Sequence, residues 1–195
     1  MGDPKFLRRT YDRPKHPWDA GRMEEERRLL VKYGLKNKRE LWKAQSILRG
    51  IRRQARDLQA RLRAGEPQAK RETDGLIARL TRLGVLPSGA TTLDDVLGLT
   101  TDGVLRRRFA TVVAEKGLAP TPLSARKLIV QGHLSIDGRR MTRPGYLLPS
   151  AAEASVAYSG TSPLNDEAHP FRVALRERAS APPREPAEPP MDERR

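Results

Sequence analysis

Hydrophobic positions in the first half of the chain recur every three or four residues, a spacing that predicts amphipathic helices. We expect an extended arm over residues 1–20, anchored by Trp18, followed by helices over residues 21–33 and 38–63. Glycine and proline interrupt the pattern after the long helix, and a shorter helix with leucines at helical spacing is expected near residues 76–83. A further short helix is expected at the segment "LDDVLGL", because a capping-box-like pattern marks its start.

The long helix predicted over residues 38–63 has an apolar face and a cationic face. Its apolar stripe is expected to comprise Ile47, Ile51, Ala55, Leu58 and Leu62. Its opposite side carries Arg49, Arg52, Arg53, Arg56 and Arg63. A solvated helix face usually mixes both signs in pairs four residues apart, and acids are nearly missing here. We therefore expect this face to meet a polyanion.

The second half of the chain begins with two further helices, predicted over residues 101–117 and 121–132. Arg106, Arg107 and Arg108 lie in the first two turns of the first of these helices. Cations at that end oppose the helix dipole, so helix stability alone does not favour them. A bound anion is the simple explanation.

A change of hydrophobic period from four to two follows Gly132 and predicts β-structure. Leu134 and Ile136 alternate with polar residues, and Asp137-Gly138 is a strong hairpin-turn signal. The return strand is expected to begin at "RRM", and "YLLP" and "ASVAY" are expected to form further short strands.

These patterns predict an α+β protein in three parts. Residues 1–100 are expected to form an N-terminal arm and a helical region, and residues 101–170 a small helix-helix-β unit. Residues 171–195, which end in a proline-rich and charged segment, are expected to be a disordered tail.

The charge balance narrows the choice of partner. The chain has 38 Lys+Arg against 24 Asp+Glu, for a net charge of +14. Residues 36–63 hold ten bases and two acids, and residues 103–143 hold nine bases and two acids, whereas residues 176–195 are neutral. Two basic blocks of this kind favour a polyanionic partner, and at this point nucleic acid, a membrane surface and an acidic protein all remain open.

Other function classes are not favoured by the composition. The chain has no cysteine and three widely separated histidines, so we expect no disulfide, no metal site and no cofactor. It has no apolar run near ~20 residues and no signal-peptide core at its start, so we expect no membrane span and a cytoplasmic location.

The segment "LSARKLIVQGHLSIDGRRMTRPGYLL" resembles the RNA-binding module of the S-four family of small-subunit ribosomal proteins. The matching residues are Ser124, Ala125, Arg126, Leu128, Ile129, Gly132, His133, Gly138, Pro144 and Tyr146. The same module also occurs in RNA-modifying enzymes. The segments "MGDPK", "HPW", "KYGLKNKRELWKAQSILR", "RRQAR", "TTLDDVLGLT" and "LRRRF" resemble the archaeal and eukaryotic form of the ribosomal family itself, over roughly residues 1–160. Two departures exist, since "LRRRF" is more arginine-dense than the family pattern and the proline-rich tail is not part of it.

The resemblance implies a primary binder of small-subunit ribosomal RNA that acts early in subunit assembly. It also implies a position on the cytoplasmic ribosome beside the fifth small-subunit protein, near the channel through which messenger RNA enters, where the pair influences decoding accuracy. The alternatives are a non-ribosomal RNA-binding factor and an RNA-modifying enzyme built on the same module. An enzyme of that kind needs a large catalytic domain for which this chain has no room, so we expect no catalytic residues.

Two RNA-binding faces are predicted from the arginine and lysine positions, because each neutralised phosphate releases counterions and the arginine fork suits phosphate. The first face is expected to comprise Arg106, Arg107, Arg108, Arg126, Lys127, Gln131, His133, Arg139, Arg140 and Arg143. The second is the Arg49, Arg52, Arg53 and Arg56 side of the long helix. His133 either contacts RNA or packs locally, and Ser124 is expected to make a local hydrogen bond at the start of its helix.

Overall fold

The computed structural model describes residues 9–87, 89 and 92–180. Its helices are α1 (Ala20–Lys32), α2 (Lys38–Arg63), α3 (Pro67–Arg82), α4 (Leu93–Leu97), α5 (Thr101–Arg106), α6 (Phe109–Glu115), α7 (Pro122–Gln131) and α8 (Pro170–Ser180). Its strands are β1 (Leu134–Ile136), β2 (Arg139–Arg140) and β3 (Val156–Tyr158), with short 3-10 turns η1 (Ala151–Glu153) and η2 (Pro163–Asn165) on either side of β3. The strands form one antiparallel sheet in the order β2-β1-β3. The predicted α+β class is confirmed.

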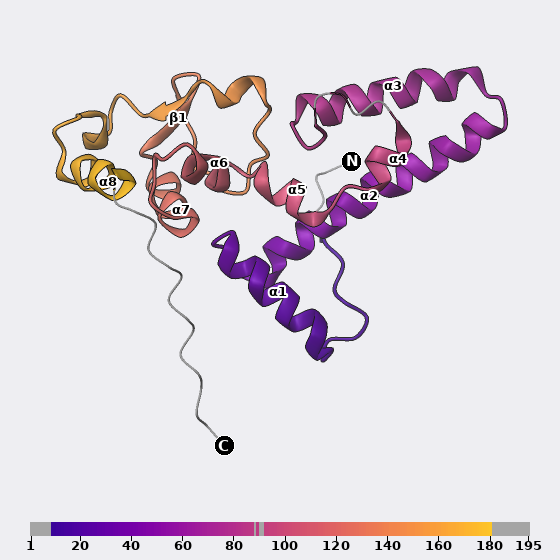
Figure 1. Cartoon of the computed structure of the whole chain (residues 1–195), viewed down its shortest axis with the longest axis horizontal. Coiled ribbons are helices and arrows are strands. Elements are labelled where there is room, and N and C mark those ends of the chain that lie inside the picture. The colour runs from indigo at the N-terminus through magenta and orange to yellow at the C-terminus, as the bar shows by residue number, and fades with distance from the viewer. Residues whose placement is uncertain (1–8, 88, 90–91, 181–195) are drawn as a thin grey trace, which may run out of the picture.

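Two clusters of buried side chains divide the described residues into two lobes. One cluster runs from Tyr33 to Leu105 and fills the helical lobe, α1 to α5. The other runs from Phe109 to Leu164 and fills the mixed lobe, in which α6, α7 and the sheet share one core. Figure 1 shows the long α2–α3 pair on one side, the sheet with α7 and α8 on the other, and α5 between them.

The long helix α2 has the bounds that its sequence predicts, but a different buried stripe. Asn37 begins the helix by accepting a hydrogen bond from the Glu40 backbone N–H at 3.2 Å. The buried positions are Leu41, Ala44, Leu48, Ile51, Ala55 and Leu58. Ile47 and Leu62, which were expected in the stripe, are 42% and 36% exposed. The stripe is shifted because α1, α3, α4 and α5 all pack on α2, and the side they cover is set by those partners.

The N-terminal arm is held by a residue other than the expected one. Trp18 is 87% exposed, so its expected role as the anchor is wrong. Tyr11 instead packs against Trp42 of α2 with ring centroids 6.0 Å apart, and the Asp12 backbone N–H donates to Ser46 at 3.1 Å. The described part of the arm therefore lies along α2, and the portion before residue 9 lies outside the described residues.

Glu26 is a buried acid that ties α1 to α2. Its carboxylate accepts from Arg22 Nη1 at 2.5 Å and from Trp42 Nε1 at 3.1 Å, and it pairs with Lys38 Nζ at 3.2 Å. Burial alone would raise the pKa of Glu26, but the hydrogen bonds from Trp42, Lys38 and Arg22 hold it below its usual 4.5. Glu26 therefore contributes stability only while it is ionised.

This contact predicts a pH dependence of stability. Because the pKa of Glu26 is lower in the folded chain, its contribution is fully present above about pH 4.5 and is lost as the pH falls through the folded value. Glu26→Gln is expected to reduce the free energy of unfolding most near pH 7 and progressively less in acid, as urea unfolding over a pH series will measure. The exposed neighbour Glu25→Gln is the control. If Glu26→Gln lowers the free energy of unfolding by the same amount from about pH 7 to pH 3, the stabilising role of the ionised Glu26 is contradicted.

The helix expected over residues 101–117 is broken into α5 and α6. The backbone of Arg108 is extended, with φ −71° and ψ 139°, and α6 begins at Phe109. The first amides of α6 find acceptors in the loop after β2, where Tyr146 accepts from Phe109 N–H at 2.8 Å and Pro144 from Ala110 N–H at 3.3 Å. The helix-dipole reasoning was therefore wrong for Arg106, which lies in the last turn of α5, where a cation is favourable, but it still applies to Arg108, which is the N-cap of α6.

The hairpin of the mixed lobe forms as expected. Asp137 and Gly138 have φ of 51° and 74°, which matches the two-residue turn that the sequence predicts. β3 covers the expected "ASVAY" segment, whereas "YLLP" forms only an isolated bridge between Leu147 and Arg108. Leu147 pairs only with Arg108, at the break between α5 and α6, and one bridge does not make a strand.

The C-terminal segment is ordered further than expected. The disordered tail was expected from residue 171, but α8 continues to Ser180, so the expected boundary is wrong. Phe171 packs against the core of the mixed lobe, and the Arg172 guanidinium lies 5.2 Å from the ring centroid of Tyr158. The remainder of the expected tail, residues 181–195, lies outside the described residues.

Candidate nucleic-acid interface

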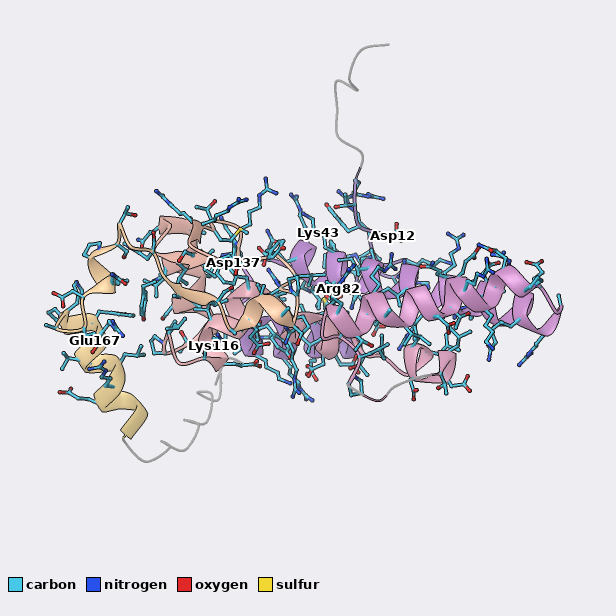
Figure 2. All side chains as sticks on the ribbon, turned by 90° about the horizontal axis from the view of Figure 1, so that it is seen from above. Asp12, Lys43, Arg82, Lys116, Asp137 and Glu167 are labelled. Atoms are coloured by element: carbon cyan, nitrogen blue, oxygen red, sulfur yellow. The ribbon has the colours of Figure 1, made fainter. Side chains whose placement is uncertain are left out.

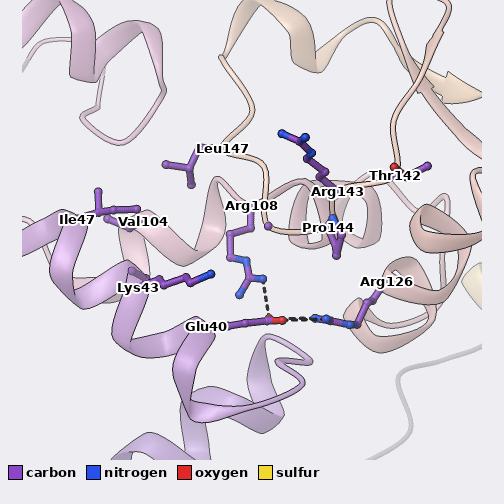
Figure 3. Close-up of a pocket in the computed structure, with 12 residues that line it drawn as sticks. Glu40, Lys43, Ile47, Val104, Arg108, Arg126, Thr142, Arg143, Pro144 and Leu147 are labelled. Atoms are coloured by element: carbon purple, nitrogen blue, oxygen red, sulfur yellow. Dashed lines mark hydrogen bonds and ion pairs between the residues drawn. The ribbon is translucent and has the colours of Figure 1, made fainter. Parts of the chain in front are cut away.

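A carboxylate of the helical lobe joins two arginines of the mixed lobe. Glu40, near the start of α2, accepts from Arg126 Nη1 at 2.9 Å and pairs with Arg126 Nη2 at 2.8 Å. It also accepts from Arg108 Nη2 at 2.8 Å. Figure 3 shows the carboxylate between the two guanidinium groups. Burial alone would raise the pKa of Glu40, but the hydrogen bonds from Arg126 and Arg108 hold it low, so the carboxylate stays ionised.

Two members of the predicted arginine triplet are held within the chain. The Arg108 side chain is 8% exposed and directed at Glu40. The Arg107 side chain donates to the Leu83 carbonyl at 3.0 Å, to the Leu148 carbonyl at 3.1 Å and to Glu153 at 2.9 Å. The expectation that both side chains lie on an open RNA face does not agree with this placement, because both guanidinium groups contact other segments of the chain.

Other predicted residues of the first face are exposed. Lys127 and Gln131 lie on the outer side of α7, and Arg139 lies in β2, whose two residues are both exposed. Arg140 Nη2 lies 3.4 Å from the Gln131 carbonyl at the C-terminal end of α7, where a cation is favourable. The structure therefore brings the end of α7 and the return strand of the hairpin side by side.

Arg106 and Arg143 lie nearer the junction of the lobes. The Arg106 side chain is 64% exposed, with its Nε 3.6 Å from Asp102. Arg143 is exposed in the loop after β2 and lines a cavity together with Arg126. Both side chains extend the exposed cationic surface of the mixed lobe toward α2.

His133 and Ser124 make local contacts. The His133 Nδ1 lies 2.9 Å from the Ser162 hydroxyl, which links the start of β1 to the loop after β3. The Ser124 backbone N–H donates to the Thr121 hydroxyl at 3.2 Å, and the two hydroxyls lie 3.0 Å apart. His133 therefore has a packing role in this structure, and Ser124 takes part in the cap of α7 as expected.

The predicted second face on α2 is only partly open. Arg49 pairs with Asp12 of the arm at 2.7 Å, and Arg52 is half-buried and donates to the Leu99 carbonyl. Arg53 and Arg56 are exposed. Arg49, Arg52 and Arg56 line a hollow of about 380 Å³ beside Thr101, so three of the four share one surface while Arg53 does not line it.

Lys43 and Glu40 were not singled out from the sequence. Both line the cavity between α2 and the loop after β2, and Glu40 is one of only two acids among residues 36–63. An isolated acid in a basic block is the signal that could have drawn attention to this position, since it indicates a fixed partner for a nearby cation.

The described residues hold no group of three or more histidine, aspartate or glutamate side chains arranged to bind a metal ion. Among the same residues, no helix combines the length and the apolar character that crossing a membrane requires.

Residues 107–153, which include α6, α7 and the β1–β2 hairpin of the mixed lobe, match the model of the S4 domain. Over 175 residues, or 90% of its length, the chain is 49% identical to the small ribosomal subunit protein uS4 of Thermoplasma volcanium, 87% of which is covered. It is 48% identical over 90% of its length to the uS4 proteins of Thermoplasma acidophilum and Picrophilus torridus, of which 87% and 95% are covered. The chain belongs to the uS4 family, and the resemblance seen in the sequence is confirmed.

Proposed function

We propose that this protein is a structural constituent of the small ribosomal subunit that binds small-subunit ribosomal RNA. The observation that carries the proposal is a set of exposed cations in the S4 domain, with Lys127 on α7, Arg139 and Arg140 on β2 and Arg143 in the loop that follows. Folded RNA is recognised largely through its shape, phosphates and 2′-hydroxyls, which suits a chain with a net charge of +14 and only 5% aromatic residues.

The residues of the predicted site are assigned two proposed roles, contact with RNA and positioning of the segments that make this contact. The exposed residues Lys127, Gln131, Arg139, Arg140 and Arg143 are the proposed RNA contacts of the S4 domain, Arg106 is the proposed contact of α5, and Arg49, Arg52, Arg53 and Arg56 are those of α2. Arg107 and Arg126 are proposed to position these segments, since their guanidinium groups already pair with Glu153 and Glu40.

The finer parts of the proposal follow the family resemblance. We propose an early, primary role in subunit assembly, a place beside the fifth small-subunit protein near the channel for messenger RNA, and a contribution to decoding accuracy on cytoplasmic ribosomes. The proposed role is structural and needs no cofactor. A separate RNA-binding factor or an RNA-modifying enzyme is not favoured, because the similarity covers 90% of the chain and not the S4 domain alone.

The RNA-binding surface is tested by removing two exposed cations. Lys127→Gln with Arg139→Gln is expected to weaken binding to a small-subunit ribosomal RNA fragment about tenfold and to reduce the slope of log affinity against log salt by about two. Filter binding over a salt series measures both. The matched control, Lys70→Gln with Arg71→Gln, removes two exposed cations from α3. Equal losses in both variants would show that binding depends on total charge and not on this surface.

Membership in the particle is tested by sedimentation. The tagged chain is expected to travel with the small subunit at one copy per particle through a wash of moderate salt. A chain that stays at the top of the gradient overturns the proposed function.

A further inference from the structure

A cavity of about 380 Å³ lies between α2 and the S4 domain, and most of its charged groups are cations. The charged residues that line it are Glu40, Lys43, Arg108, Arg126 and Arg143. These are four cations and one carboxylate, so the lining has a formal charge of +3. In Figure 2 Lys43 lies near the middle of the long axis, where the lobes meet. Glu40 is already shared between Arg126 and Arg108, and the positive charge that remains is uncompensated.

One donor in this cavity is buried without an acceptor. The Arg108 side chain is 8% exposed, and its Nη1 has no hydrogen-bond partner among the described residues, whereas Nη2 donates to Glu40. A buried donor without an acceptor destabilises the fold, and more so when it is charged. Such groups are rare in folded proteins and call for a specific explanation.

Two further cations, Lys43 and Arg143, line the same cavity. Figure 3 shows the Lys43 side chain extending toward the Arg108 guanidinium, with Arg143 on the other wall of the cavity. Neither Lys43 nor Arg143 has an ion pair with a described residue. Lys43 and Arg143 are both exposed, and like charges beside the nearly buried Arg108 guanidinium repel one another. A bound anion would remove both the repulsion and the missing hydrogen bond of Arg108.

The shape and lining of the cavity indicate which anion fits. A phosphate has several acceptor oxygens and can be shared by an arginine fork, a lysine and a second arginine at once. Ile47, Val104 and Leu147 form an apolar wall in the same cavity, with room for the sugar attached to that phosphate. Ile47 is 42% exposed, which is consistent with this use.

We propose that this cavity binds a single phosphate group, with Arg108 Nη1 and Lys43 as its donors and Arg143 at its rim. The inference rests on the proposed function for the source of the ligand, which is a backbone phosphate of the bound RNA. Inorganic phosphate is the other source of the same chemistry. Glu40 holds the Arg108 guanidinium through Nη2, and Nη1 is the donor left for the phosphate.

Phosphate-ethylation interference on a small-subunit ribosomal RNA fragment tests the RNA source. The full chain, its Lys43→Met variant and the control Lys70→Met, an exposed lysine on α3, are compared. Lys43→Met is expected to lose interference at one phosphate, leave the others unchanged, and bind about five- to tenfold more weakly. Lys70→Met is expected to keep the wild-type pattern. If the wild-type chain does not bind the fragment, the proposed function fails, and the cavity is judged by the second measurement alone.

That second measurement uses inorganic phosphate and needs no RNA. Phosphate added to the ¹⁵N-arginine-labelled full chain is expected to shift the Arg108 guanidinium resonance saturably, with at least fivefold weaker binding in Lys43→Met and no change in Lys70→Met. A phosphate response without altered interference makes free phosphate the source, and altered interference makes RNA the source. An unchanged interference pattern together with an unresponsive Arg108 overturns the inference.

Discussion

Replacing Glu40 by glutamine is expected to lower the free energy of unfolding by about 3 kcal/mol, because breaking a buried ion pair strands the charges that remain. Arg108 is almost fully buried and Arg126 largely so, and Glu40 is the carboxylate that both contact. Glutamine keeps the size of the side chain but removes its charge. Urea unfolding followed by circular dichroism measures the loss.

Glu72→Gln is the matched control for Glu40→Gln. Glu72 pairs with Arg61 at 2.8 Å, but both side chains are about one third exposed, so the expected loss is below about 1 kcal/mol. A cycle that combines Glu40→Gln with Arg126→Gln is expected to show a smaller loss than the sum of the two single changes. Equal losses for Glu40→Gln and Glu72→Gln would mean that Glu40 does not hold the lobes together.

Gly34→Ala is expected to be similarly damaging, with a loss of about 3 kcal/mol from backbone strain and steric conflict together. Gly34 lies between α1 and α2 at φ +57°, a conformation that L side chains rarely adopt. A Cβ at this position would lie 2.7 Å from the Leu123 backbone N and 3.0 Å from the Pro122 carbonyl carbon. Since these are backbone atoms at the start of α7, no side-chain rotation relieves the contact, and the S4 domain has to move away from the α1–α2 turn.

Gly65→Ala separates strain from steric conflict. Gly65, just after α2, has φ +79°, but a Cβ there would meet nothing within 4 Å. It is expected to lose only about 1 kcal/mol, the cost of the left-handed backbone itself. Thermal or urea unfolding of both variants measures the difference. Equal losses would show that the steric conflict with Leu123 does not add to the cost of the left-handed backbone.

The sequence predicts the elements whose signals are local. The bounds of α2 follow from the cap at Asn37 and a continuous helical period, and the hairpin follows from the residues of its own turn at Asp137 and Gly138. The anchoring role of Trp18 was wrong because the residue that packs on Trp42 is Tyr11, a contact between segments that no local pattern marks.

The candidate site is predicted less well, for a reason of the same kind. Exposed cations such as Lys127 and Arg139 are found from charge and period alone. Nothing in the sequence distinguishes Arg107 and Arg108 from these exposed cations. Their acceptors come from segments far along the chain, which no local pattern marks. Lys43 was missed because its neighbours in the cavity are brought together only by the packing of α2 against the S4 domain.

The separation of Glu40 from its partners along the chain also bears on the order of folding during synthesis. Arg108 follows Glu40 by 68 residues and Arg126 by 86. At translation rates of roughly 5–20 residues per second, the second arginine is made roughly 4 to 17 seconds after the carboxylate. Until Arg108 is made, Glu40 has neither of these partners, and the cavity is complete only after Leu147, the last of its lining residues along the chain, has been made. The two lobes therefore close late, and the phosphate-binding arrangement is among the last features of the nascent chain to form.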